Sequence, residues 1–262
     1  MMKTIGIEAF LTWAFTRELC KGGADQRGGG MAFSEAWRSI TEMAELGVLI
    51  DRSPNAFGVI PDISDETPPH PDAVLAGNAV RALAAASFPV PAIPLFPEMH
   101  DPHGLIADEV AQVRHELHLR GDEANASHVV ALVITSAVLG RGPDTTAEQP
   151  KFRMVETSGK PAWFIQRRAK DAFGNIYTFE DDGYDARSGR PRPRAYRKWR
   201  LAESMRGAIM GRIEHIWWRE ALKSVWVDIA ARLSDHRLMQ NSLFETRFHA
   251  TTNERQQTEI NG

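Results

Sequence analysis

Apolar residues at the spacing of a helix dominate residues 201–238 of this chain, just before a polar C-terminal segment. Between Leu201 and Leu238 such residues recur every three or four positions, which is the period of one helix face. They are Met205, Ile209, Ile213, Ile216, Val225, Ile229 and Leu233. We therefore expect one long C-terminal helix or a helical hairpin, although Gly207 and Gly211 lower helix propensity in its first turns.

Shorter elements are expected upstream, separated by glycine and proline. Helical periodicity predicts helices at 5–20, 34–46, 72–87, 105–119 and 126–139. Four prolines in the segment 88–97 predict an extended strap there. Strand candidates at 152–155, 163–166 and 176–179, with a turn at 171–175, predict a small antiparallel sheet of about three strands. The fold class expected from these elements is α+β and mostly helical.

The first 62 residues resemble part of a winged helix. A helix over 34–46 ends in Leu46-Gly47-Val48-Leu49-Ile50, and a turn at 52–55 leads to a second strand at 57–60. The order of helix, glycine-rich loop, helix and hairpin is similar to the second half of that family, which has three helices before its wing. The resemblance implies contacts with DNA or with a protein.

Charge is distributed very unevenly along the chain. Residues 1–150 carry 10 Lys and Arg against 20 Asp and Glu, whereas residues 151–238 carry 19 against 11. We divide the chain into a winged-helix-like segment 1–62, an acidic helical region 63–150, a basic region 151–238 and a flexible tail 239–262. The asymmetry predicts different partners for the two halves, or attraction between them.

Composition excludes several classes of protein. A hydrophobic fraction of 43% and a charged fraction of 25% are typical of globular chains. The single cysteine, Cys20, excludes an intramolecular disulfide framework and a multi-cysteine metal site. We find no targeting signal and no apolar run of membrane-spanning length. We therefore expect a cytoplasmic protein that needs no cofactor.

The segment 187–200 is the strongest candidate for a binding site. It holds seven basic residues and no acidic residue, and its two prolines, Pro191 and Pro193, prevent a helix. An extended arginine segment fits a narrow A·T minor groove, where the negative potential is strong. The predicted nucleic-acid-binding residues are Arg187, Arg190, Arg192, Arg194, Tyr196, Arg197, Lys198, Trp199 and Arg200. The alternative is a solvated basic loop that pairs with acidic protein surface.

Two short resemblances bear on this segment. Gly189-Arg190-Pro191 resembles the core of AT-hook peptides, and residues Gly159–Leu201 look like uncharacterised proteins from prophage and gene-transfer-agent regions of alphaproteobacteria. The resemblances imply a phage-derived accessory protein or transcription regulator that binds DNA. We expect a non-enzymatic function, with nucleic acid as one partner and a protein contacting the acidic half as another.

A second candidate site consists of histidines. His100, His103, His115 and His118 have spacings that permit a shared metal ion, to which Asp101 and Asp108 could add ligands. This set supports the alternative of a metal-dependent hydrolase or nuclease. Ordinary surface histidines are the simpler interpretation, and no catalytic residue is assigned. A purely structural interaction module is the remaining alternative.

The helical stripe also suggests self-association. With Trp217, Trp218 and Trp226 it offers more apolar surface than a thin sheet can cover, and closed dimers commonly bury such surface. We therefore expect a homodimer, with one of the two consecutive tryptophans packed on the sheet and the other at an interface. The alternative is that the helix at 129–139 and the strap already cover the stripe.

Overall fold

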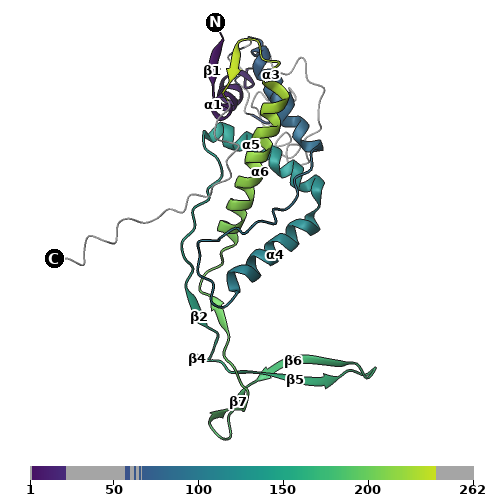
Figure 1. Ribbon diagram of the computed structural model, residues 1–262, viewed down its shortest axis with the longest axis vertical. Coiled ribbons are helices and arrows are strands. Elements are labelled where there is room, and N and C mark those ends of the chain that lie inside the picture. The colour runs from purple at the N-terminus through teal and green to yellow at the C-terminus, as the bar shows by residue number, and fades with distance from the viewer. Residues whose placement is uncertain (1, 22–56, 60–61, 63–64, 66, 240–262) are drawn as a thin grey trace, which may run out of the picture. The chain divides into compact units, whose positions relative to one another are not determined.

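The computed structural model describes residues 2–21, 57–59, 62, 65 and 67–239 (Figure 1). Helices and short antiparallel strand pairs make up an α+β fold, which confirms the predicted class. The predicted helix at 34–46 and strand at 48–50 lie outside the described residues, as does the tail after residue 239. The winged-helix resemblance therefore stays a prediction. Among the described helices, none combines the length and hydropathy needed to cross a bilayer.

The chain divides into two units. Unit 1 comprises Met1–Ala92, Leu117–Thr145 and Gly211–Gly262, and unit 2 comprises Ile93–Glu116 and Thr146–Met210. Each unit draws on more than one of the segments that charge and composition suggested. This happens because elements far apart in the sequence pair with one another, as the strands below illustrate.

Unit 1 is built mainly from helices. Helix α1 (Ile7–Trp13) continues as a π-helical turn over Ala14–Glu18, and α3 (Pro71–Ala82) continues as a 3-10 turn over Leu83–Ala85. Helix α5 (Asp122–Leu139) ends at Gly140, whose left-handed φ of 64° suits a helix cap. Fully buried Phe10, Val80 and Val129 place the core between these three helices. The predicted helices at 5–20, 72–87 and 126–139 are thus present with shifted ends.

A parallel strand pair in unit 1 was not expected from the sequence. Strand β1 (Lys3–Ile5) pairs with β10 (His236–Leu238), in a register that places Lys3 opposite His236 and Ile5 opposite Leu238. Three residues are too few to show an alternating pattern, and β10 lies where we expected the end of the long helix. The pairing joins the two ends of the described chain.

Helix α6 (Arg206–Ile229) is one continuous helix with both of its consecutive tryptophans buried. The expectation that one of them lies at an interface is wrong. The Trp217 ring donates to the Pro89 carbonyl at 2.9 Å, and Trp218 packs against Gly142, where its ring leaves no room for a Cβ. Most of the apolar stripe is buried within the chain, including Ile209, Ile213, Val225 and Ile229. The exposed surface that suggested a dimer is therefore absent from α6, and the dimer stays a prediction.

Unit 2 consists of α4 (Leu105–Arg120), which extends into unit 1, and four short antiparallel strand pairs. These pairs are β2 (Phe152–Met154) with β9 (Trp199–Leu201), β3 (Glu156–Thr157) with β4 (Lys160–Pro161), β5 (Phe164–Lys170) with β6 (Ile176–Asp182), and β7 (Tyr184–Asp185) with β8 (Arg190–Pro191). The predicted strands exist, but they do not form one three-stranded sheet. Strand β2 pairs instead with β9, a segment that local alternation did not identify as a strand.

Candidate functional site

The segment 187–200 lies in unit 2 and contains no helix, as its prolines predict, but its short strands alternate with turns at 186–189 and 192–195. In the backbone register of the strands, Arg190 of β8 lies opposite Asp185 of β7, and Arg200 of β9 lies opposite Arg153 of β2. Between these two pairs, Phe164 and Tyr196 exchange backbone hydrogen bonds at 2.8 Å in both directions. The backbone of the segment is therefore held at several points.

Five arginines of this segment have exposed side chains and neither an ion pair nor an aromatic partner within the described part of the chain. They are Arg187, Arg190, Arg192, Arg194 and Arg200, hereafter the exposed arginines. The nearby carboxylate of Asp185 is occupied by Ser188 Oγ at 2.9 Å and by the Arg187 backbone N–H at 3.0 Å. These hydrogen bonds, with that from Ser188 first, hold the pKa of Asp185 below its usual value.

One of the exposed arginines has an unusual backbone conformation. Residues 192–195 form a turn in which Ala195 N–H donates to the Arg192 carbonyl at 3.0 Å, and Arg194 has a φ of 67°. Proline before a residue of positive φ is typical of a type II turn, where glycine or asparagine normally occupies the position of Arg194. A non-glycine residue there costs about 1 kcal/mol or more. The turn therefore retains an arginine at an energetic cost.

The other four predicted binding residues have partners inside unit 2. Tyr196 and Lys198 both bind the Glu180 carboxylate. The bond to Lys198, followed by that to Tyr196, lowers the pKa of Glu180, and the same carboxylate raises the pKa of Tyr196. Arg197 lies over the Trp163 ring at 4.5 Å, and Trp199 stacks on His103 at 4.6 Å with 11° between the rings. The available basic surface is thus narrower than the sequence suggested.

A buried histidine–aspartate group in unit 1 is the one cluster of three potential metal ligands among the described residues. His70, Asp72 and His236 each offer a ligand atom within 4.8 Å of the others. Trp13 contacts both histidine rings, at 5.5 Å from His70 and 4.5 Å from His236. The sequence alone does not reveal this group, because His236 lies 164 residues after Asp72 in the chain.

Hydrogen bonds already occupy most of these ligand atoms. Asp72 is fully buried and accepts from the backbone N–H groups of Ser234, Asp235 and His236, from the Ser234 hydroxyl and from His236 Nδ1, at 2.8–3.1 Å. His70 Nδ1 accepts from the Asp72 N–H at 3.1 Å and so caps α3, while its Nε2 lies 3.1 Å from Asp235. Of the four ring nitrogens in these two histidines, three take part in these contacts, and His236 Nε2 is the one that does not within the described residues. A metal ion would have to displace these bonds, so we interpret the group as a structural clamp.

Electrostatics agrees with that interpretation. Burial by itself would raise the pKa of Asp72, but the hydrogen bonds from Ser234, His236 and Asp235 outweigh burial and hold that pKa well below its usual range. A carboxylate with several donors is strongly favoured in its charged form. We call His70, Asp72, Ser234, Asp235 and His236 the Asp72 clamp.

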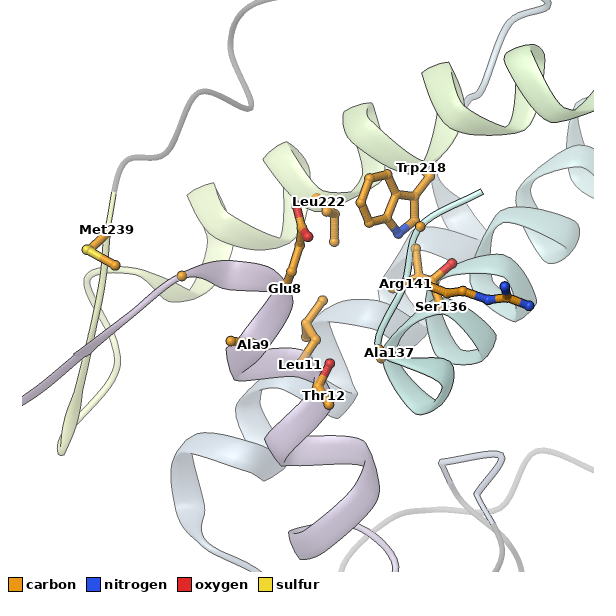
Figure 2. Close-up of a pocket in the computed structure, with 14 residues that line it drawn as sticks. Glu8, Ala9, Leu11, Thr12, Ser136, Ala137, Arg141, Trp218, Leu222 and Met239 are labelled. Atoms are coloured by element: carbon orange, nitrogen blue, oxygen red, sulfur yellow. The ribbon is translucent and has the colours of Figure 1, made fainter. Parts of the chain in front are cut away.

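A pocket of about 560 Å³ lies elsewhere in unit 1, between α1, the end of α5 and α6 (Figure 2). Leu11, Leu222 and Trp218 contribute apolar wall, and Thr12 and Ser136 contribute hydroxyls. In Figure 2, the Glu8 side chain points towards Leu222 and Trp218, whereas the Arg141 guanidinium extends away from them. The pocket offers no set of positive groups for an anionic ligand.

The four histidines of the metal alternative do not belong to the ligand cluster found among the described residues. The His100 backbone N–H donates to Gln149 at 3.1 Å, and the His103 ring stacks on Trp199. His115 and His118 lie on α4. No observation in this part of the chain favours a hydrolase over a binding protein.

Comparisons of the chain with protein-family models, with curated proteins and with solved structures gave no match.

Proposed function

We propose that this protein binds nucleic acid, with DNA as the expected form, through the exposed arginines of unit 2. The observation that carries the proposal is that these five side chains are solvated and unpaired within the described residues, on a backbone held by strand pairing. Basic groups without acidic partners attract phosphates, and releasing condensed counterions drives such binding. The strained turn supports the proposal, because an arginine kept at φ 67° points to a role for its side chain.

The proposal has a definite magnitude. Each phosphate contact contributes about −0.9 to the slope of log affinity against log salt, so five contacts give about −4.5. Affinity should then fall about 500-fold between about 50 mM and 200 mM salt. Lys198 is not counted, because Glu180 already neutralises it.

The test compares two charge-matched variants by fluorescence anisotropy with a labelled A·T-rich duplex. One variant replaces the exposed arginines with alanine. The control replaces five exposed basic residues of unit 1: Lys3, Arg17, Arg120, Arg141 and Arg237. We expect the first variant to lose binding and the control to retain it with an unchanged salt slope. Equal losses in both variants would show that net charge alone binds DNA, and would refute the assignment.

The same proposal gives the acidic half a different partner. Residues 1–150 carry twice as many acidic as basic residues, which disfavours contact with phosphates and favours contact with a protein. We therefore propose a regulatory or accessory role in the cytoplasm, in which unit 2 contacts nucleic acid and the acidic residues contact a protein.

A further inference from the structure

Apart from one bridge at its base, where Phe164 pairs with Tyr196, the β5–β6 hairpin of unit 2 has no third strand on either edge within the described residues. Its seven residue pairs run from Phe164 opposite Asp182 to Lys170 opposite Ile176, and six of the seven residues in β6 are exposed. Figure 1 shows the two strands running together to a free tip. An isolated two-stranded ribbon is only marginally stable in water, so a partner on one of its faces would stabilise it.

The tip of this ribbon is ordered and ends in an exposed phenylalanine. The Asp171 carboxylate accepts from the backbone N–H groups of Phe173 and Asn175 at 2.9 and 2.8 Å, and from the Asn175 side chain at 3.0 Å. Gly174 provides the positive φ of 86° that closes the turn. Phe173 is 91% exposed. The aromatic ring at the tip is therefore presented to solvent by a preorganised turn.

Further aromatic rings lie behind the tip on one face. Tyr177 and Phe179 alternate along β6, so both point to the same side, with ring centroids 6.0 Å apart. They are 50% and 39% exposed. Residues two apart on a strand lie about 7 Å apart, which is wider than the spacing of stacked bases and suits bases that are unpaired and spread out.

The charges on the ribbon favour an anionic partner. Arg168 and Lys170 are exposed towards the opposite face, and neither has an ion pair in the described part of the chain. The acidic residues nearer the base have partners of their own: Asp181 pairs with Arg167 at 3.0 Å, and Glu180 binds Lys198. The free end of the ribbon therefore carries exposed aromatic rings on one face and the two cations Arg168 and Lys170 on the other, with the Asp171 carboxylate in the turn between the strands.

We propose that the distal part of this ribbon, residues 167–179, binds single-stranded nucleic acid by stacking unpaired bases on Phe173, Tyr177 and Phe179. Aromatic rings contact the π-faces of bases, which a duplex hides, and flanking basic side chains follow the backbone. The inference rests on the proposed function and narrows it: the exposed arginines contact phosphates of any nucleic acid, whereas the ribbon selects unpaired strands.

The test measures the affinity of the protein for two labelled ligands of the same length, a single-stranded deoxythymidine oligomer of about 15 nucleotides and a duplex. This length is within the site sizes of about 4–16 nucleotides that are usual for proteins that bind single strands. The double variant Phe173→Ala, Tyr177→Ala should bind the oligomer about tenfold more weakly or worse, with duplex binding unchanged. Replacing the exposed arginines with alanine should weaken the binding of both the oligomer and the duplex. The matched control Leu119→Ala, Val227→Ala removes apolar side chains that are 74% and 69% exposed elsewhere, and should change neither affinity. Phe173→Trp should retain oligomer binding.

The outcomes separate the two proposals. Unchanged oligomer binding by the aromatic variant, or equal weakening of oligomer and duplex, overturns the ribbon inference and leaves the arginine proposal standing. Wild-type protein that binds neither ligand at low salt overturns both. If light scattering shows a wild-type dimer that the aromatic variant converts to a monomer, with oligomer binding unchanged, the ribbon is a self-association surface and the inference is wrong.

Discussion

The substitution Asp72→Asn tests whether the Asp72 clamp holds unit 1 together. Asparagine keeps the shape of the side chain but replaces one acceptor oxygen with an NH₂ group. Oδ1 of Asp72 accepts two hydrogen bonds and Oδ2 accepts three. In either orientation of the amide, at least one backbone N–H then faces another donor, because only the Ser234 hydroxyl can turn to accept, and the side chain at position 72 has no exposure to water.

The magnitude follows from this count. An unsatisfied buried donor costs about 1–3 kcal/mol, and each hydrogen bond that the charged carboxylate loses is worth about 1.5–3 kcal/mol. We expect a loss of about 3–5 kcal/mol in the free energy of unfolding. That is a large share of the roughly 5–15 kcal/mol that stabilises an ordinary domain. The loss should be concentrated in unit 1, because the clamp joins the start of α3 to the segment that leads into β10.

The assay is urea unfolding followed by far-UV circular dichroism, with Asp108→Asn as the control because Asp108 is an exposed aspartate on α4. The pH dependence provides a second readout. Because the folded-state pKa of Asp72 is lowered, its contribution is fully present above the unfolded value of 3.8 and is lost as the pH falls below it towards the folded value. Wild-type protein should therefore lose more stability on acidification than Asp72→Asn. A variant within about 1 kcal/mol of wild type, or one with the same acid dependence, would refute the clamp.

Two other predictions concern α6 and the clamp. A Cβ at Gly211 would lie well inside contact distance of the Asp144 backbone carbonyl, whereas a Cβ at Gly207 would meet nothing within 4 Å. Gly211→Ala should therefore lower the free energy of unfolding by about 1–3 kcal/mol. Gly207→Ala should leave the free energy of unfolding unchanged or raise it by up to about 1 kcal/mol. Equal effects of the two substitutions would argue against a close approach of Gly211 to the Asp144 carbonyl. Zinc added to metal-free protein should not shift the melting temperature measured by differential scanning fluorimetry, because hydrogen bonds occupy all but one of the clamp's candidate ligand atoms. A rise of several degrees would instead assign a metal site to His70, Asp72 and His236.

Helices were the part of this fold that the sequence determined by itself. Apolar residues at helical spacing predicted α4 and α5, with ends displaced by a few residues, and left open one helix or a hairpin over 201–238, where the structure has the single helix α6. Pro191 and Pro193 likewise predicted that the basic segment contains no helix, although turns interrupt its extended backbone. These features depend on hydrogen bonds, side-chain spacing and ring geometry within a few residues, so local sequence is sufficient to predict them.

Strand pairing was decided only in the tertiary structure. Local alternation identified the positions of β2, β5 and β6, yet β2 pairs with β9, and β1 pairs with β10 from the far end of the described chain. Strands of two or three residues carry almost no pattern. Their partners depend on where the packed helices bring distant segments together, which no local window of sequence contains.

The candidate site shows the same division at the level of side chains. The sequence marked seven basic residues in 187–200 as equivalent, but the fold brings Glu180 to Lys198 and Trp163 to Arg197 and leaves five arginines exposed. It also gathers Asp72 and His236 into a buried clamp. The charge of a side chain follows from the identity of the residue. Its partners and its exposure to water depend on residues far away in the chain, and those partners and that exposure decide whether the charge is neutralised, buried or free to bind.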